Sequence, residues 1–281
     1  MSAPSIGRAR WYWPSLLAAV LTGSTLLLNP SPTSAGASVS CEYTPSNHKV
    51  VITATGSGDV TVTRNARGRI LANGSPCSPI ATIANTDRIV ILAGNGDQAV
   101  NIRIQHGGFK PGWTDEPGNS DEIEIAVSTG AGFDSLFILG DIGNDNIVYG
   151  KSSSGFAMGG VNLNAGESTG VDADVSLSVG IEQFQVWGYL GHDVISGAGG
   201  AGTGDGFQAS LVMDGNAGND TLTGGSAGDI LWGDAGKDVL WGGPGPDQIG
   251  SNDGVAGNDT IQGGKGGDSC TYDPGDSVAS C

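Results

Sequence analysis

Residues 215–271 decide the fold of this chain. Read in nines, they are GNAGNDTLT, GGSAGDILW, GDAGKDVLW and GGPGPDQIG, then an interrupted unit that ends in AGNDTIQ, and finally GGKGGDSCT. An aspartate recurs at the sixth place: Asp220, Asp229, Asp238, Asp247, Asp259 and Asp268. Two places later stands a small or medium apolar residue: Leu222, Leu231, Leu240, Ile249, Ile261 and Cys270. A short fixed period of this kind indicates a repeat architecture.

Each unit reads as a tight turn followed by a very short strand. Repeated glycine disfavours helix but permits the positive φ angles of turns. The last three residues of a unit point out, in and out, so one apolar side chain faces the interior. Two units make one coil, and stacked coils place aspartates two units apart roughly 4.8 Å from one another. The pattern predicts an all-β stack.

Carboxylates at that spacing repel one another unless a cation lies between them, and hard oxygen ligands suit Ca²⁺. The predicted partners across the stack are Asp220 with Asp238, Asp229 with Asp247, Asp247 with Asp268, and, across an insertion at residues 251–255, Asp238 with Asp259. Backbone carbonyl groups of the turns are expected to supply the remaining ligands.

Weaker copies of the pattern precede the regular repeats. TGAGFDSLF, GDIGNDNIV and GYLGHDVIS place Asp134, Asp145 and Asp193 at the sixth position, which makes them secondary candidates for calcium ligands. We therefore interpret residues 121–213 as a degenerate β-solenoid that continues into the regular repeats of residues 214–281.

The repeat resembles the hemolysin-type (RTX) calcium-binding nonapeptide repeat, G-G-x-G-x-D-x-apolar-x. The resemblance implies a parallel β-roll that holds Ca²⁺ in its turns, and it extends to secreted bacterial proteins described as calcium-binding. The chain departs from the pattern at Asn216, Ala227 and Asp234 and in the insertion.

The amino terminus predicts export. Residues 1–37 combine Arg8 and Arg10, an apolar run over residues 16–28, and the A-x-A site at residues 35–37, as in a secretory signal peptide. A membrane anchor is the alternative, but the run is short and contains hydroxyl residues. No later segment is apolar enough to span a membrane, so the expected localisation is extracellular.

The net charge of the chain indicates which classes of binding partner are unfavourable. The 281-residue chain has a net charge of −17, and removing the signal leaves 10 basic and 29 acidic residues, or −19. Such acidity disfavours nucleic acid and anionic membranes and suits divalent cations. The 50 glycines and the frequent alternation of Val, Ile and Thr support an all-β chain.

Four cysteines fit an exported protein with two disulfides. Proximity in sequence predicts the pairs Cys41–Cys77 and Cys270–Cys281, and the second would cap the open end of the stack. A cysteine metal cluster is disfavoured, because no C-x-x-C occurs.

The region before the repeats is less regular. Residues 38–106 contain several β-strand patterns and form either a cap on the solenoid or a separate small β domain. We favour the cap, because the rhythm of strands and turns continues beyond it. Residues 107–120, rich in Gly and Pro, are expected to form a loop.

No catalytic motif stands in a suitable context. G-x-S-x-G at residues 166–170 is followed by a strand pattern instead of a helix, and G-x-G-x-x-G at residues 197–202 opens no helix. The expected function is therefore a secreted, non-enzymatic calcium-binding protein. Two alternatives remain: an adhesion protein that uses the roll as a spacer and binds an extracellular protein or glycan, and a hydrolase with an unrecognised site. The outward Trp232 and Trp241 could mark a contact surface.

Overall fold

The computed structural model describes residues 36–105, 108–110, 112, 122–151, 158–165, 173–178 and 180–281. All of these lie in one compact unit, Ser34–Cys281. Within them the regular structure is β, apart from one turn of 3₁₀ helix, η1 (Pro45–Asn47). The prediction of an all-β chain is confirmed for this part of the molecule. Among the same residues, no helix has the length and hydropathy needed to cross a bilayer.

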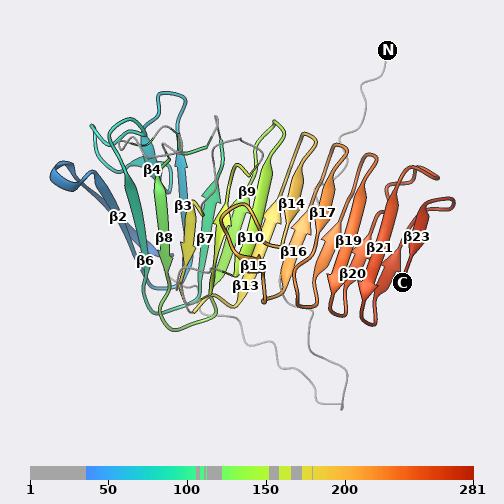
Figure 1. The fold of residues 1–281 in the computed structure, drawn as a ribbon. Helices are drawn as coiled ribbons and strands as arrows, with labels where there is room; N and C mark the ends of the chain where they lie inside the picture. The colour runs from blue at the N-terminus through green and yellow to red at the C-terminus, as the bar shows by residue number, and fades with distance from the viewer. Residues whose placement is uncertain are drawn as a thin grey trace. The chain divides into compact units, whose positions relative to one another are not determined.

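The strands form two sheets (Figure 1). The first sheet has thirteen strands: β1 (Ser38–Thr44), β2 (Lys49–Thr55), β6 (Arg88–Ala93), β8 (Glu124–Ser128), β10 (Asn146–Lys151), β11 (Gly159–Asn162), β12 (Val175–Leu177), β14 (Val194–Ser196), β15 (Asp205–Gly206), β17 (Thr221–Thr223), β19 (Val239–Pro244), β21 (Thr260–Lys265) and β23 (Ser277–Ala279). The second has ten: β3 (Gly58–Arg64), β4 (Ile70–Ala72), β5 (Ser75–Pro76), β7 (Gln98–Arg103), β9 (Ser135–Leu139), β13 (Gln183–Trp187), β16 (Leu211–Asp214), β18 (Ile230–Trp232), β20 (Gln248–Gly250) and β22 (Ser269–Thr271).

Over the repeats, consecutive strands alternate between the two sheets and pair in parallel with the strand two units away. Thus β17 pairs with β19 and β19 with β21, while β18 pairs with β20 and β20 with β22. Figure 1 shows this part of the chain in orange to red. The insertion at residues 251–255 is absorbed in a turn, because Leu240 still pairs with Ile261. Parallel pairing through short turns is what the predicted β-roll requires.

The apolar ladder has the predicted phase. Leu222, Leu231 and Leu240 have no exposed surface, and Ile249 and Ile261 are 1% exposed. The ninth-place residues Trp232 and Trp241 are 40% and 51% exposed, and they lie on different sheets. The alternation of a three-residue strand therefore assigns one side chain to the core and two to the outside.

Strands from the amino-terminal part enter the same two sheets. β2 pairs in parallel with β6, and β6 with β8, in the first sheet. β3 pairs with β7, and β7 with β9, in the second. Of the predicted loop over residues 107–120, only residues 108–110 and 112 are described.

In the middle of the first sheet, β11 interrupts the run of parallel strands. β11 lies between β10 and β12 and runs antiparallel to both. It therefore separates β10 from β12, which would otherwise be neighbouring strands of the sheet. No strand of the regular repeats has this position.

Both predicted disulfides are present. Cys41 of β1 is bonded to Cys77, and Cys270 of β22 is bonded to Cys281. The second bond ties the end of the chain to the last strand of the second sheet, where pairing would otherwise stop. The predicted signal peptide, apart from residues 36 and 37, and the G-x-S-x-G sequence at 166–170 lie outside the described residues. Residues 197–202 form turns, without a strand or helix.

Candidate metal centre

The sixth-place aspartates each stand directly before a strand and form two columns, one for each sheet. The first-sheet column contains Asp145, Asp193, Asp220, Asp238 and Asp259. The second-sheet column contains Asp134, Asp229, Asp247 and Asp268. Because strands two units apart pair in register, successive aspartates of a column lie next to one another on neighbouring strands of the same sheet.

Hydrogen bonds connect successive members of the first-sheet column. The backbone N–H of Asp220 donates to Oδ1 of Asp238 at 2.8 Å, and that of Asp238 donates to Oδ1 of Asp259 at 2.8 Å. The same bond joins Asp145 to Asp193 and Asp193 to Asp220. The structure thus brings Asp238 and Asp259 together despite the insertion between them.

The second-sheet column follows the same rule over the repeats. Asp229 N–H donates to Oδ1 of Asp247 at 2.8 Å, and Asp247 N–H donates to Oδ1 of Asp268 at 3.0 Å. Asp134 is separate: its N–H donates to Oε2 of Glu182. All four pairs predicted from the repeat period are neighbours in the structure.

The second carboxylate oxygen distinguishes these residues from ordinary turn caps. Six of them bury Oδ2 without a hydrogen-bond partner: Asp134, Asp193, Asp220, Asp238, Asp247 and Asp259. A buried charged oxygen without a partner is costly, and native structures seldom keep one without a reason. Asp229 is different, because its Oδ2 accepts the N–H of Gly225 at 2.6 Å, and Asp145 is different, because its Oδ2 accepts the N–H of Asp141 at 2.9 Å.

Glycine keeps the space around these oxygens open. A β-carbon on the first-place Gly233 would lie 2.5 Å from Oδ2 of Asp238. A β-carbon on the fourth-place Gly236 would collide with the carbonyl oxygen of Gly218 in the preceding rung. Carboxylate and carbonyl oxygens therefore approach the turn interior closely, and both are the hard ligands that Ca²⁺ prefers.

Burial makes the ionised carboxylates unfavourable when no cation is present. It raises the pKa of Asp238 to about 7; the hydrogen bond from Asp220 opposes the shift, and the nearby Asp220 and Asp259 carboxylates add to it. Burial likewise raises the pKa of Asp193 to about 7 and that of Asp229 to about 6. A divalent cation would favour the ionised forms again.

Side chains alone would not hold such a cation. Within the described part of the chain, no three His, Cys, Asp or Glu side chains converge as a metal-binding group. The expected ligand set of one or two carboxylates plus backbone carbonyl groups agrees with this arrangement. The residues fit Ca²⁺ through their unpartnered oxygens and the close approach of carbonyl groups.

Two acidic residues of the columns lie outside the nine-residue pattern and were not predicted from the sequence. Asp276, which precedes β23, accepts the N–H groups of Gly257 and Asp259, and Glu182, which precedes β13, takes the place of an aspartate beside Asp134. Both stand directly before a strand, so searching for any acidic residue at that point would have found them.

Comparison with known proteins supports the reading of the repeats. Residues 185–203, 214–249 and 253–278 match the RTX calcium-binding nonapeptide repeat in four copies. A comparison with curated proteins finds no match. The carboxyl-terminal part of the chain thus consists of RTX repeats, a class of repeat that binds Ca²⁺.

Proposed function

We propose that the protein is an exported, non-catalytic calcium-binding β-roll whose carboxyl-terminal repeats fold fully only when Ca²⁺ is bound. The observation that carries the proposal is the row of buried, unpartnered Oδ2 atoms in the turn columns. A cation between successive rungs would satisfy these oxygens and remove the repulsion along each column.

The repeats have few other sources of stability. Each three-residue strand buries one apolar side chain, whereas every ordered residue costs about 1–2 kcal/mol of backbone entropy. The two disulfides support extracellular localisation, because such bonds persist in oxidising compartments. The net charge of −17 is also well suited to collecting divalent cations.

Calorimetric titration with Ca²⁺ and Mg²⁺ tests the proposal. Ca²⁺ should bind at several sites with an accompanying gain of β circular dichroism. Mg²⁺ should do so poorly, since it demands a smaller octahedral set of ligands. Asp59→Asn, on the outer face of β3, provides a control that removes a charge outside the columns. Equal responses to the two ions, or a loss of binding in the control, would contradict the proposal.

A further inference from the structure

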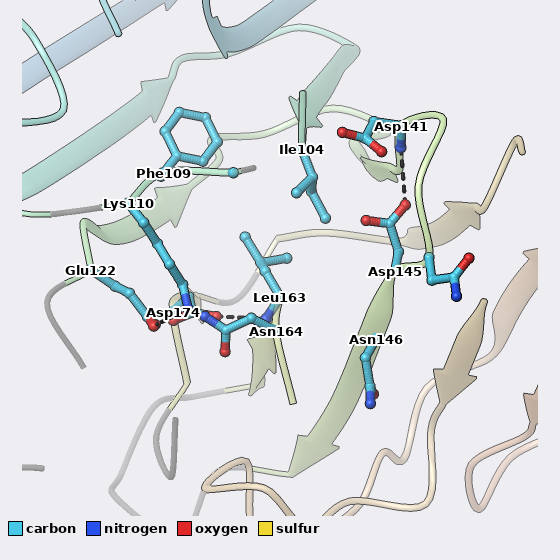
Figure 2. Close-up of a pocket in the computed structure, with 12 residues that line it drawn as sticks. Ile104, Phe109, Lys110, Glu122, Asp141, Asp145, Asn146, Leu163, Asn164 and Asp174 are labelled. Carbon is cyan, nitrogen blue, oxygen red and sulfur yellow. Dashed lines mark hydrogen bonds and ion pairs between the residues drawn. The ribbon is translucent and has the colours of Figure 1, made fainter. Parts of the chain in front are cut away.

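A cavity of about 440 Å³ lies beside the interruption of the first sheet (Figure 2). Small-molecule sites typically have volumes of about 300–1,000 Å³. Its lining comes from the turn before β10 and the first residue of that strand, from the residues just after β11 and just before β12, and from segments around residues 104, 108–110 and 122. The cavity lies outside the matched repeats, and of the aspartates assigned to the two columns only Asp145, whose Oδ2 already accepts the N–H of Asp141, is among its lining residues.

The antiparallel strand explains why the cavity forms there. Asp174 stands directly before β12 and Asp145 directly before β10, so both occupy the sixth-place position of their strands. β11 lies between them, and its end presents Leu163 and Asn164 at this edge in place of another aspartate. Two strand spacings amount to about 9–10 Å, so the carboxyl groups stand apart and a gap opens between them.

One wall of the cavity is a connected polar group. Lys110 Nζ lies 2.8 Å from Oε1 of Glu122, and the carboxyl group of Asp174 hydrogen-bonds to Glu122. Asn164 also hydrogen-bonds to Glu122. Burial, together with the adjacent Glu122, raises the pKa of Asp174 to about 9, and a proton held between the two carboxyl groups makes their hydrogen bond. The wall therefore presents ammonium and amide donors as well as acceptor oxygens.

The opposite wall is rich in acceptors. Asp145 and Asp141 face the cavity there, with Asp141 N–H bonded to Oδ2 of Asp145. Figure 2 shows Ile104 and Leu163 between the two polar walls. The cavity thus combines an apolar middle with donors on one side and acceptors on both.

This combination selects a neutral hydroxylated ligand. Hydroxyl groups donate and accept, so they can satisfy both walls, and the C–H face of a sugar ring can lie on Ile104 and Leu163. A ligand ammonium group would offer only donors and would be repelled by Lys110, whereas a ligand carboxylate would be repelled by Asp141 and Asp145. We propose that the cavity between β12 and β10 binds a neutral saccharide of one or two rings.

Saturation-transfer NMR and titration of the full, calcium-loaded chain test this proposal. The probes are the methyl glycosides of glucose, galactose and N-acetylglucosamine, the disaccharides cellobiose, maltose and lactose, and two charged analogues, glucosamine and glucuronate. At least one neutral probe should bind in preference to both charged analogues. Its amide shift changes should centre on Leu163, Asn164 and Asn146.

Matched variants connect binding to the cavity. Asn164→Ala and Glu122→Gln should each weaken binding by about tenfold, as expected for the loss of one hydrogen bond. Gln185→Ala, on the outer face of β13, should leave it unchanged. If either cavity variant fails to fold, the shift map of the unsubstituted chain still decides the question.

Three results would overturn the inference: no neutral probe binds, glucosamine or glucuronate binds more tightly, or the shift changes lie away from the cavity. Retained affinity in a folded Asn164→Ala protein would also overturn it. Because calcium is saturating throughout, a failure of saccharide binding leaves the calcium proposal untouched.

Discussion

Replacing Asp238 by asparagine separates the charge of a turn carboxylate from its structural hydrogen bond. The new side chain keeps an oxygen that can accept the N–H of Asp220, as Oδ1 of Asp238 does at 2.8 Å. It removes the negative charge and the unpartnered Oδ2. Because Asp238 lies between Asp220 and Asp259, the change should impair calcium binding at two sites, one between Asp220 and Asp238 and one between Asp238 and Asp259.

The expected size follows from mass action. At a free Ca²⁺ concentration a hundred times the dissociation constant, each site adds about 2.7 kcal/mol to the free energy of unfolding. Loss of one or two sites should therefore lower the melting temperature in calcium by about 5–20 °C, given about 2–4 °C per kcal/mol for a chain of this size. In chelator the sign should reverse, because burial makes the ionised Asp238 unfavourable there.

Thermal unfolding of both proteins, in calcium and in chelator at pH 7.5, measures the two effects. Asp59→Asn serves as the control and should change little under either condition. A comparable loss of stability with and without calcium would mean that Asp238 serves only as a hydrogen-bond acceptor, and would refute the reasoning.

Three further predictions follow from the same geometry. Leu231→Ala should lower the free energy of unfolding in calcium by about 2–5 kcal/mol, because this side chain is fully buried. Thr223→Ala, at an outward position of β17, should lower it little. Equal losses would mean that the assignment of inward and outward positions in the repeat is wrong. Gly236→Ala should lower calcium affinity and stability by calorimetry and melting, since its β-carbon meets a backbone carbonyl oxygen, while Gly267→Ala, which has open space, should be tolerated. In chelator, stability should fall as pH rises from about 4 to about 7, because burial raises the pKa of Asp238 from 3.8 to about 7 and the stability present below the unfolded pKa is lost as pH passes the folded value. Calcium should reverse this trend by binding the ionised form, and urea unfolding at a series of pH values measures it.

The sequence predicted the buried side chains and the neighbouring strands correctly wherever a fixed repeat period determined how the strands pair. A nine-residue repeat with a three-residue strand leaves one choice of inward side chain, which placed Leu231 and Leu240 in the core. The same period predicted that Asp220 meets Asp238. The disulfide Cys270–Cys281 followed from proximity in sequence, since little chain separates the two cysteines.

The cavity could not be predicted in the same way. It depends on β11 running antiparallel, and neither a fixed spacing nor a motif marks that reversal in the sequence. Glu122 and Asp174 meet only because β12 pairs with β8, which is far from it along the chain. Alternating apolar residues without a period predict strands but leave the choice of partner strand open.

Hydrogen–deuterium exchange of the full chain, with calcium and with chelator, tests the central claim most directly. We predict that β16 to β23 are protected in calcium and exchange much faster in chelator. In contrast, β2, β6 and β7 should change little, since these strands are longer and bury more apolar side chains. Equal protection of the repeats with and without calcium would contradict it, because the roll would then be held by its core and disulfide alone.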